Sequence, residues 1–470
     1  MMRYSSPVTQ MSLIGISLLL TFIVRRLLIN YLLQSTPLNE NPTFDLYWPT
    51  SAIACASGFV AIFVINLIGV RAIFLFQSIF SVVYASSIVV GYQYNNFIFH
   101  SIAYIIISLG YNLARVATIV VVLTYSSERW RTRALGTYLF LEYFSMTMGD
   151  LIAHRNRNDS NAKHLHVAIA TLSIACLAPF FAAAIAPINK VVRSNGVYLI
   201  ARESNFGNEV KQTLAMFKNK YMLLLLPYMF SYPFLYSVAN AVLEDTLTVI
   251  LYDLGKLSII AMGQLLDVPW STRRTRGLVG YATLLFFFVL SSSLTVTTRM
   301  LDNGWSQVDP SWSKARINEF LTMNALKIHR GISMASYFFG GVASSFIELF
   351  GFWVIGTLTN DVRACGRFVG TYHSVMSIGG MIGIQIISNV PLKYVPINMP
   401  AFAGLAITII SLILLYFIIR RITDTNDWTL GKIANTENST DGNTKSDQSS
   451  ETYMVITDVK YRHIEDQAGD

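Results

Sequence analysis

The sequence predicts an all-α membrane protein with about twelve transmembrane helices in two six-helix halves. Hydrophobic residues make up 53% of the 470 residues and charged residues only 13%, about half of the roughly 25% usual in soluble proteins. Apolar stretches of about 20 residues, long enough to cross a bilayer as a helix, recur along the chain. One polar, basic stretch divides them into two sets of six. Neither a soluble domain nor a hydrolytic enzyme is therefore expected.

Each predicted span follows from helix geometry. A helix rises about 1.5 Å per residue, so about 20 mostly apolar residues cross a hydrocarbon core about 30 Å thick. The stretches that meet this condition are 10–33, 51–69, 72–91, 97–124, 134–153, 165–188, 220–242, 246–266, 277–298, 333–358, 366–390 and 397–420. The eighth is the least apolar, because Asp253 and Lys256 interrupt it. Polar residues and no small-residue cleavage site follow the first, so we expect a retained helix rather than a signal peptide.

The spans fall into a simple domain plan. We expect an N-terminal six-helix half over 1–188, a cytoplasmic linker over 189–219 and a C-terminal six-helix half over 220–421. The tail 422–470 is rich in Asn, Thr, Ser, Asp and Gly, and we expect it to be disordered and cytoplasmic. Two six-helix halves with a solute site between them are the plan of a major facilitator bundle.

Lysine and arginine counts predict the orientation. With both termini inside, the inner loops and helix ends hold seventeen of these residues and the outer loops hold nine. Cytoplasmic loops carry the excess of Lys and Arg, so the bias predicts two cytoplasmic termini. It does not distinguish the plasma membrane from an internal membrane. Asn158, in an outer loop, begins a glycosylation sequon, although the loop is short and close to the bilayer.

The loop after the eighth span predicts a cytoplasmic gate. Asp267 ends that span, and Arg273, Arg274 and Arg276 follow within ten residues. An acid at a helix end can pair with an arginine while the inner face is closed, and water can replace that pair when the face opens. The turn after the fourth span completes the predicted gate with Glu128, Arg129 and Arg133. Alternatively, these arginines only enforce topology.

Charged residues inside the predicted spans are the other candidate site. Each one costs about 2.5–3.5 kcal/mol on insertion scales, so each needs a partner or a function. These candidates are Arg25, Arg26, Arg115, Glu142, Asp150, Lys256 and Glu348. Counting depth from the inner span ends at about 1.5 Å per residue predicts three pairs. They are Arg115 with Glu142, Arg25 or Arg26 with Asp150, and Lys256 with Glu348.

Three interpretations of these charges remain open. The pairs can be structural, since pairing lowers the cost of burial and fixes helix register. Alternatively, adjacent Arg25 and Arg26 point about 100° apart on a helix, so one acid cannot satisfy both. One of them could then attract an anionic solute, while Glu142 or Glu348 carries a coupling proton. The third interpretation is that the two arginines snorkel to the outer interface.

Several stretches give the chain a family resemblance. They are RYSSP at 3–7, YSSERWRTR at 125–133, VVRSNG at 191–196 with the gate loop 267–276, and WVIGTLTND at 353–361 followed by GTYHSVMSIGG at 370–380. In this order and spacing they resemble the fungal branch of the uncoordinated-93-like family of the major facilitator superfamily. The resemblance covers roughly residues 3–421. It implies a major facilitator fold with a central cavity.

The resemblance leaves two functions open. Members of the family are discussed as transporters, whereas better-known relatives regulate potassium channels or escort receptors. The gate arginines favour a secondary transporter of a small solute or ion that works by alternating access. The first helix lacks the family's Pro-Gly stretch, and Glu244-Asp245 replaces a basic run, which favours a non-transporting partner of another membrane protein.

Other classes of function have no support in the sequence. We find no nucleotide, dinucleotide, hydrolase or zinc motif, so neither an enzyme, a cofactor nor a bound metal is expected. The expected partners are the lipid bilayer, a small solute or ion and, under the alternative, another membrane protein. The net charge of +8 lies in short clusters between the spans, so no nucleic acid is expected.

Overall fold

The computed structural model describes a bundle of helices. It covers residues 6–35, 42–94, 97–126, 130–155, 161–187, 191, 206–240, 246–268, 271–305, 324–358, 362–389 and 398–422. Apart from Ile422, the predicted tail lies outside these ranges, as do the sequon at Asn158 and the gate residues Glu128 and Arg129. All the statements below concern the compact unit Met1–Asn426.

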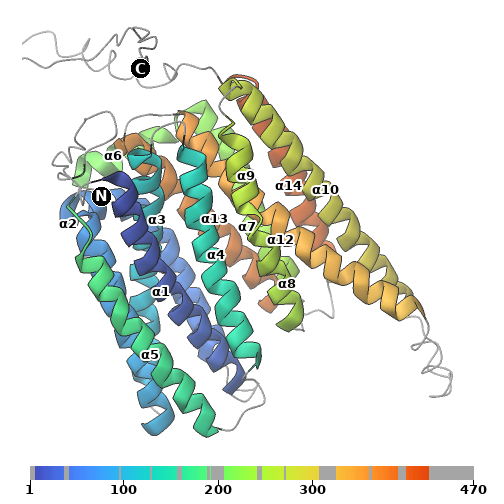
Figure 1. Ribbon diagram of the computed structural model, residues 1–470. Helices are drawn as coiled ribbons and strands as arrows, with labels where there is room; N and C mark the ends of the chain where they lie inside the picture. Colours follow the sequence, from blue (N-terminus) through green and yellow to red (C-terminus); the bar gives the residue numbers. More distant parts are fainter. Residues whose placement is uncertain are drawn as a thin grey trace, which may run out of the picture. The chain divides into compact units, whose positions relative to one another are not determined.

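The first half of the chain is helical throughout most of its length (Figure 1). Its helices are α1 (Pro7–Ser35), α2 (Pro42–Tyr94), α3 (Phe97–Tyr125), α4 (Arg131–Arg155) and α5 (Asn161–Ala183). Helix α2 contains two predicted spans, 51–69 and 72–91, which meet at Gly69. The backbone there has φ 80° and ψ 159°, a conformation that glycine adopts without a steric penalty. The break lies where the sequence predicted a turn.

The second half repeats this organisation. Its helices are α7 (Lys220–Asn240), α8 (Thr246–Lys256), α9 (Ile259–Leu266), α10 (Arg273–Trp305), α12 (Asn324–Leu358), α13 (Val362–Asn389) and α14 (Asn398–Ile419). The predicted span 246–266 is divided at Leu257 and Ser258, whose N–H groups bond three residues back instead of four. Inside the predicted linker 189–219, the structure places an additional helix, α6 (Phe206–Met216).

The described helices confirm the predicted fold class. Among the described residues, nine helical segments are long and apolar enough to cross a membrane, and one of them, Pro49–Gly91, spans 43 residues and the Gly69 break. The predicted spans in α4 and α13 are less apolar than these nine, because both helices bury polar and charged residues in the interior of the bundle. Helix α2 contains two crossings, and α8 and α9 together make one. Counted in this way, the described helices make about twelve crossings in two halves.

The two halves meet along two lines. Helix α4 packs against α8 and α9, and α2 packs against α13. Small residues also allow close approach within the second half: a Cβ atom at Gly341 of α12 would overlap the carbonyl oxygen of Tyr252 in α8. This contact sets the position of the neighbouring charges on α8 at the boundary with α4.

Candidate functional site

A buried cluster of three charges joins the two halves at the centre of the bundle. Arg115 of α3 contacts Glu142 of α4 with its Nε atom, 3.0 Å from Oε1. Its Nη2 atom donates to Glu348 of α12, in the other half. The three side chains are 10%, 1% and 4% exposed, respectively. A single guanidinium is therefore shared between one carboxylate from each half.

Tyrosines complete the hydrogen bonding of the two carboxylates. The hydroxyl of Tyr111 donates to Glu142 at 2.9 Å, and the hydroxyl of Tyr143 donates to Glu348. The guanidinium of Arg25 lies over the Tyr111 ring, 3.9 Å from its centroid. Among the described residues, Arg25 has no carboxylate partner. The cluster of Arg115, Glu142 and Glu348 carries one excess negative charge. Within the described part of the chain, Arg25 is connected to this cluster through the Tyr111 ring, whose hydroxyl donates to Glu142.

A second buried cluster lies between α1, α4 and α8. Arg26 donates to both carboxylate oxygens of Asp150, at 2.7 and 2.8 Å, and its Nη2 lies 3.5 Å from Asp253 across the boundary between the halves. Lys256 donates to Asp253 at 3.0 Å. With two cations and two carboxylates, this cluster is neutral, in contrast to the central one.

The ammonium of Lys256 is also enclosed by aromatic rings. Its Nζ lies 4.5 Å from the ring centroid of Tyr252, 5.0 Å from that of Tyr236 and 5.1 Å from that of Tyr143. Ring faces attract cations, most strongly where water is excluded. Tyr143 therefore contacts both clusters: its ring faces Lys256 of the second cluster, and its hydroxyl donates to Glu348 of the central one.

The structure brings together most of the predicted charges, but one predicted pair is wrong. Arg115 pairs with Glu142, and Arg26, rather than Arg25, pairs with Asp150. Lys256 does not pair with Glu348. It pairs with Asp253, one turn away on its own helix, while Glu348 is occupied by Arg115. Asp253 interrupts a predicted span, and an acid and a lysine three residues apart in an apolar helix are the sequence signal for this pair.

The predicted gate at the other end of α4 has a different arrangement from the one expected. The Asp267 carboxylate accepts a hydrogen bond from the backbone N–H of Arg133 at 2.7 Å, in the first turn of α4, rather than from a guanidinium. Asp267 therefore caps a helix of the opposite half. Burial raises the pKa of the Asp267 carboxyl above its ordinary value, and the hydrogen bond from Arg133 opposes this rise.

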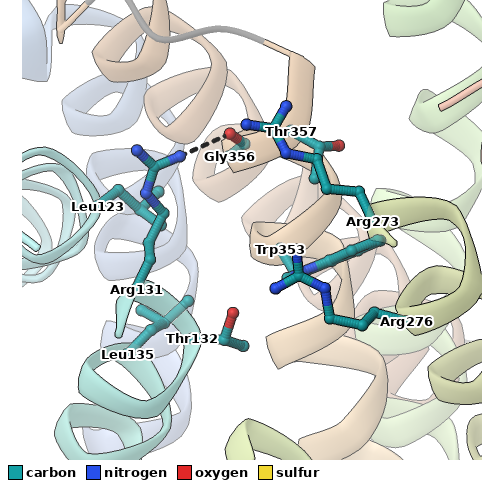
Figure 2. A pocket seen from close by; sticks show the side chains of 9 residues that line it. All are labelled: Leu123, Arg131, Thr132, Leu135, Arg273, Arg276, Trp353, Gly356 and Thr357. Carbon is teal, nitrogen blue, oxygen red and sulfur yellow. Dashed lines mark hydrogen bonds between the residues drawn. The ribbon is translucent and has the colours of Figure 1, made fainter. Parts of the chain in front are cut away.

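A cleft lies beside this cap, between α4, α10 and α12. It contains about 380 Å³ of empty space, part of it open to solvent, and its lining includes Arg131, Thr132, Arg273, Arg276, Trp353 and Thr357 (Figure 2). Arg131 Nη1 donates to the Gly356 carbonyl at 2.8 Å. Arg274, which the sequence assigned to the gate, is exposed and does not line the cleft. The sequence did not predict this cleft, because its lining residues come from α4, α10 and α12, which are far apart in the chain.

Comparisons with known proteins agree with this fold. No family model matches the chain. UNC93-like protein 1 and UNC93-like protein 2 of Arabidopsis thaliana are each 22% identical to it over 314 residues, or 62% of this chain. The chain spans only 65% of the length of these relatives.

Solved structures resemble the chain over more of its length. The major facilitator transporter FucP in the outward conformation matches with a TM-score of 0.58 and 10% identity, over 88% of this chain and 99% of FucP. The human organic anion transporter MFSD10 matches with a TM-score of 0.56 and 12% identity, over 87% and 99%. The proton:xylose symporter XylE matches with a TM-score of 0.53 and 10% identity, over 92% and 98%. The chain is a multi-pass membrane protein with the major facilitator fold.

Proposed function

We propose that this chain is a secondary transporter of a small solute or ion, and that Arg115, Glu142 and Glu348 form its coupling site. The observation that carries the proposal is the guanidinium of Arg115, shared between a carboxylate from each half. Alternating access rocks one half against the other around a central site. Such a motion separates α4 from α12, so Arg115 must release one carboxylate in each cycle.

The excess negative charge of the cluster favours a proton as the coupling ion. Two carboxylates share one guanidinium, and an uncompensated charge in a buried site is costly. Protonation of Glu348 would neutralise the cluster and release Arg115 from the second half, leaving its pair with Glu142 intact. Two structural neighbours, the E. coli fucose:proton symporter FucP and the proton:xylose symporter XylE, are proton symporters by name.

Arg25 is the cation that we assign to the solute. Arg26 is held by Asp150 and Asp253, whereas Arg25 rests on the ring of Tyr111 beside the coupling site. A solute with a negative or hydrogen-bond-accepting group could bind Arg25 without breaking an ion pair. We further propose that both termini face the cytoplasm, that the Arg131 end of α4 is the cytoplasmic end, and that the chain is a distant UNC93-like protein. Its placement in the fungal branch remains a prediction from the sequence.

A melting screen of the purified protein tests the transporter proposal. Ions and metabolites are screened for a rise in melting temperature, and each solute that stabilises the protein is then followed in proteoliposomes with a pH dye inside. We expect at least one solute to drive proton movement, and Glu348→Gln to bind that solute without moving protons. A broad panel that gives no shift, or proton movement that persists in Glu348→Gln, would contradict the proposal.

The same screen addresses the alternative function. A non-transporting regulator or trafficking partner of a channel or receptor is compatible with the UNC93-like relatives. Such a protein should co-purify with one membrane client and show no melting response to small solutes. The shared arginine at the boundary between the halves favours the transporter, because a static scaffold has no need to hold its halves together through charges that can exchange partners.

A further inference from the structure

Helix α6 is fixed to the bundle by one of its faces. It lies at the end of the bundle where the chain begins, in contact with α2 of the first half (Figure 1). The carboxylate of Glu209 in α6 accepts a hydrogen bond from Nε of Arg367 in α13 of the second half, at 2.8 Å. Glu209 is 4% exposed, and Thr213, one turn later on the same face, is 9% exposed. This inner face therefore holds α6 against both halves.

A second face of α6 is apolar and exposed. Val210 and Leu214 lie one turn apart and are 41% and 62% exposed. Each of them follows a residue of the inner face, Glu209 or Thr213, so the two faces are about 100° apart around the helix axis. The apolar face is therefore turned roughly a quarter of the way round the helix from the face that packs on the protein, and the bundle does not cover it.

Positive charge accompanies the apolar face. Lys211 follows Val210, Lys218 lies in the turn after α6, and both lysines are exposed. Glu209 is the only acid in the stretch 206–219, and Arg367 already binds it. The exposed side of α6 thus combines an apolar row with lysines. This combination is typical of helices that lie in the interface of a bilayer, where the apolar row enters the membrane and the lysines contact anionic headgroups.

We propose that α6 docks on the surface of the bilayer, with Val210 and Leu214 at the boundary between headgroups and acyl chains, and with Lys211 and Lys218 at the phosphates of anionic lipids. The bundle spans a bilayer, so α6 at its end is already held close to the headgroups. Binding of a tethered segment does not carry the entropic cost of recruitment from solution. A short helix with two exposed apolar side chains can therefore bind. The proposal does not depend on solute transport.

Hydrogen exchange tests the proposal in the full-length protein. Exchange of the peptide 206–218 is compared between nanodiscs of phosphatidylcholine and nanodiscs that contain phosphatidylglycerol. One lysine near an anionic surface strengthens binding by about fivefold, so exchange should be at least this much slower in the anionic nanodiscs. Lys211→Gln/Lys218→Gln should remove the difference, and Leu214→Gln should speed exchange in both. Ala215→Gln is the matched control and should behave like the wild type, because Ala215 is exposed but lies about 100° beyond Leu214.

A spin label measures the depth of α6 directly. Cys55, Cys176 and Cys365 are replaced by alanine, and a nitroxide is attached at Leu214→Cys or at Ala215→Cys. Oxygen concentrates in the bilayer and a nickel chelate stays in water, so oxygen should relax the label at 214 and nickel the label at 215. Equal exchange in the two nanodiscs, or equal nickel access at both positions, would overturn the proposal and leave the apolar face to another protein. Neither measurement uses a solute, so failure of the transporter proposal leaves this one standing.

Discussion

Arg115 and Glu348 lie 233 positions apart in the chain, and their side chains form a buried ion pair across the boundary between the two halves. The same guanidinium holds Glu142 in its own half. Arg115 thus belongs to two pairs, and removing different members of the cluster leaves different charges behind. This difference gives the first prediction.

We expect Arg115→Gln to destabilise the protein much more than Glu348→Gln. Loss of Glu348 leaves a neutral pair of Arg115 and Glu142, whereas loss of Arg115 leaves two buried carboxylates without a cation. Breaking a buried pair by removing one partner costs about 3–5 kcal/mol, and here one substitution breaks two pairs. Melting temperature and the monodisperse fraction in detergent measure the effect. Equal losses in the two variants would indicate that Arg115 does not bridge the carboxylates.

A double-mutant cycle distinguishes the observed lysine pair from the one the sequence predicted. Lys256 lies 3.0 Å from Asp253, so Lys256→Met and Asp253→Asn should show a coupling energy of about 0.5–3 kcal/mol. The matched cycle of Lys256→Met with Glu348→Gln should show much less, because Glu348 is bound by Arg115. Unfolding in a denaturing detergent series provides the free energies. A larger coupling energy in the second cycle would instead support the pair of Lys256 and Glu348 that the sequence predicted.

The lysine pair shows what the sequence can and cannot predict about these charges. Depth counted along a helix predicted that Arg115 meets Glu142 and that an arginine of α1 meets Asp150, and both pairs form. Counting residues along a helix gives the depth of a residue in the membrane, but it does not give the direction in which the side chain points. Lys256 and Glu348 match in height, but Asp253 is closer on the same helix and Arg115 occupies Glu348.

The sequence predicted the fold more completely than the site, for a related reason. Span length and apolarity act along the chain, so they predicted the crossings and the turn at Gly69. The packing of α4 against α8 and α9 is a relation between elements far apart in sequence. For that reason the cleft between α4, α10 and α12, and the capping of α4 by Asp267, could not be derived from the gate loop alone. The break between α8 and α9 follows Gly255 by two residues, but a single glycine in an apolar stretch does not by itself predict a break.

Substitution of Asp267 should separate its capping role from its charge. Asp267→Ala removes the acceptor for the Arg133 N–H, and loss of such a cap costs about 0.5–2 kcal/mol. Asp267→Asn keeps an acceptor oxygen and removes a charge whose burial is unfavourable. We therefore expect the alanine variant to melt lower than the wild type, and the asparagine variant to melt at least as high. Differential scanning fluorimetry at neutral pH ranks the three proteins.

The pH dependence of the Asp267→Asn comparison follows from the same pKa shift. Folding raises the pKa of Asp267, so the folded protein takes up this proton at a higher pH than the unfolded chain. Lowering the pH through the raised pKa then stabilises the wild type, whereas asparagine does not titrate. The stability of the wild type relative to Asp267→Asn should therefore rise as the pH is lowered from neutral toward the ordinary carboxyl range near pH 4. A gap that widens in favour of asparagine on acidification would show that the pKa is lowered.

The contact between α8 and α12 gives a test that does not involve charge. A Cβ atom at Gly341 would overlap the backbone carbonyl of Tyr252, and overpacking that forces backbone shifts costs about 1–3 kcal/mol. We expect Gly341→Ala to lower the melting temperature and to weaken the aromatic enclosure of Lys256, since α8 carries both Tyr252 and Lys256. Gly331→Ala is the matched control on the same helix, because nothing lies within 4 Å of its added Cβ. A Gly341→Ala protein as stable as this control would mean that α8 and α12 lie farther apart.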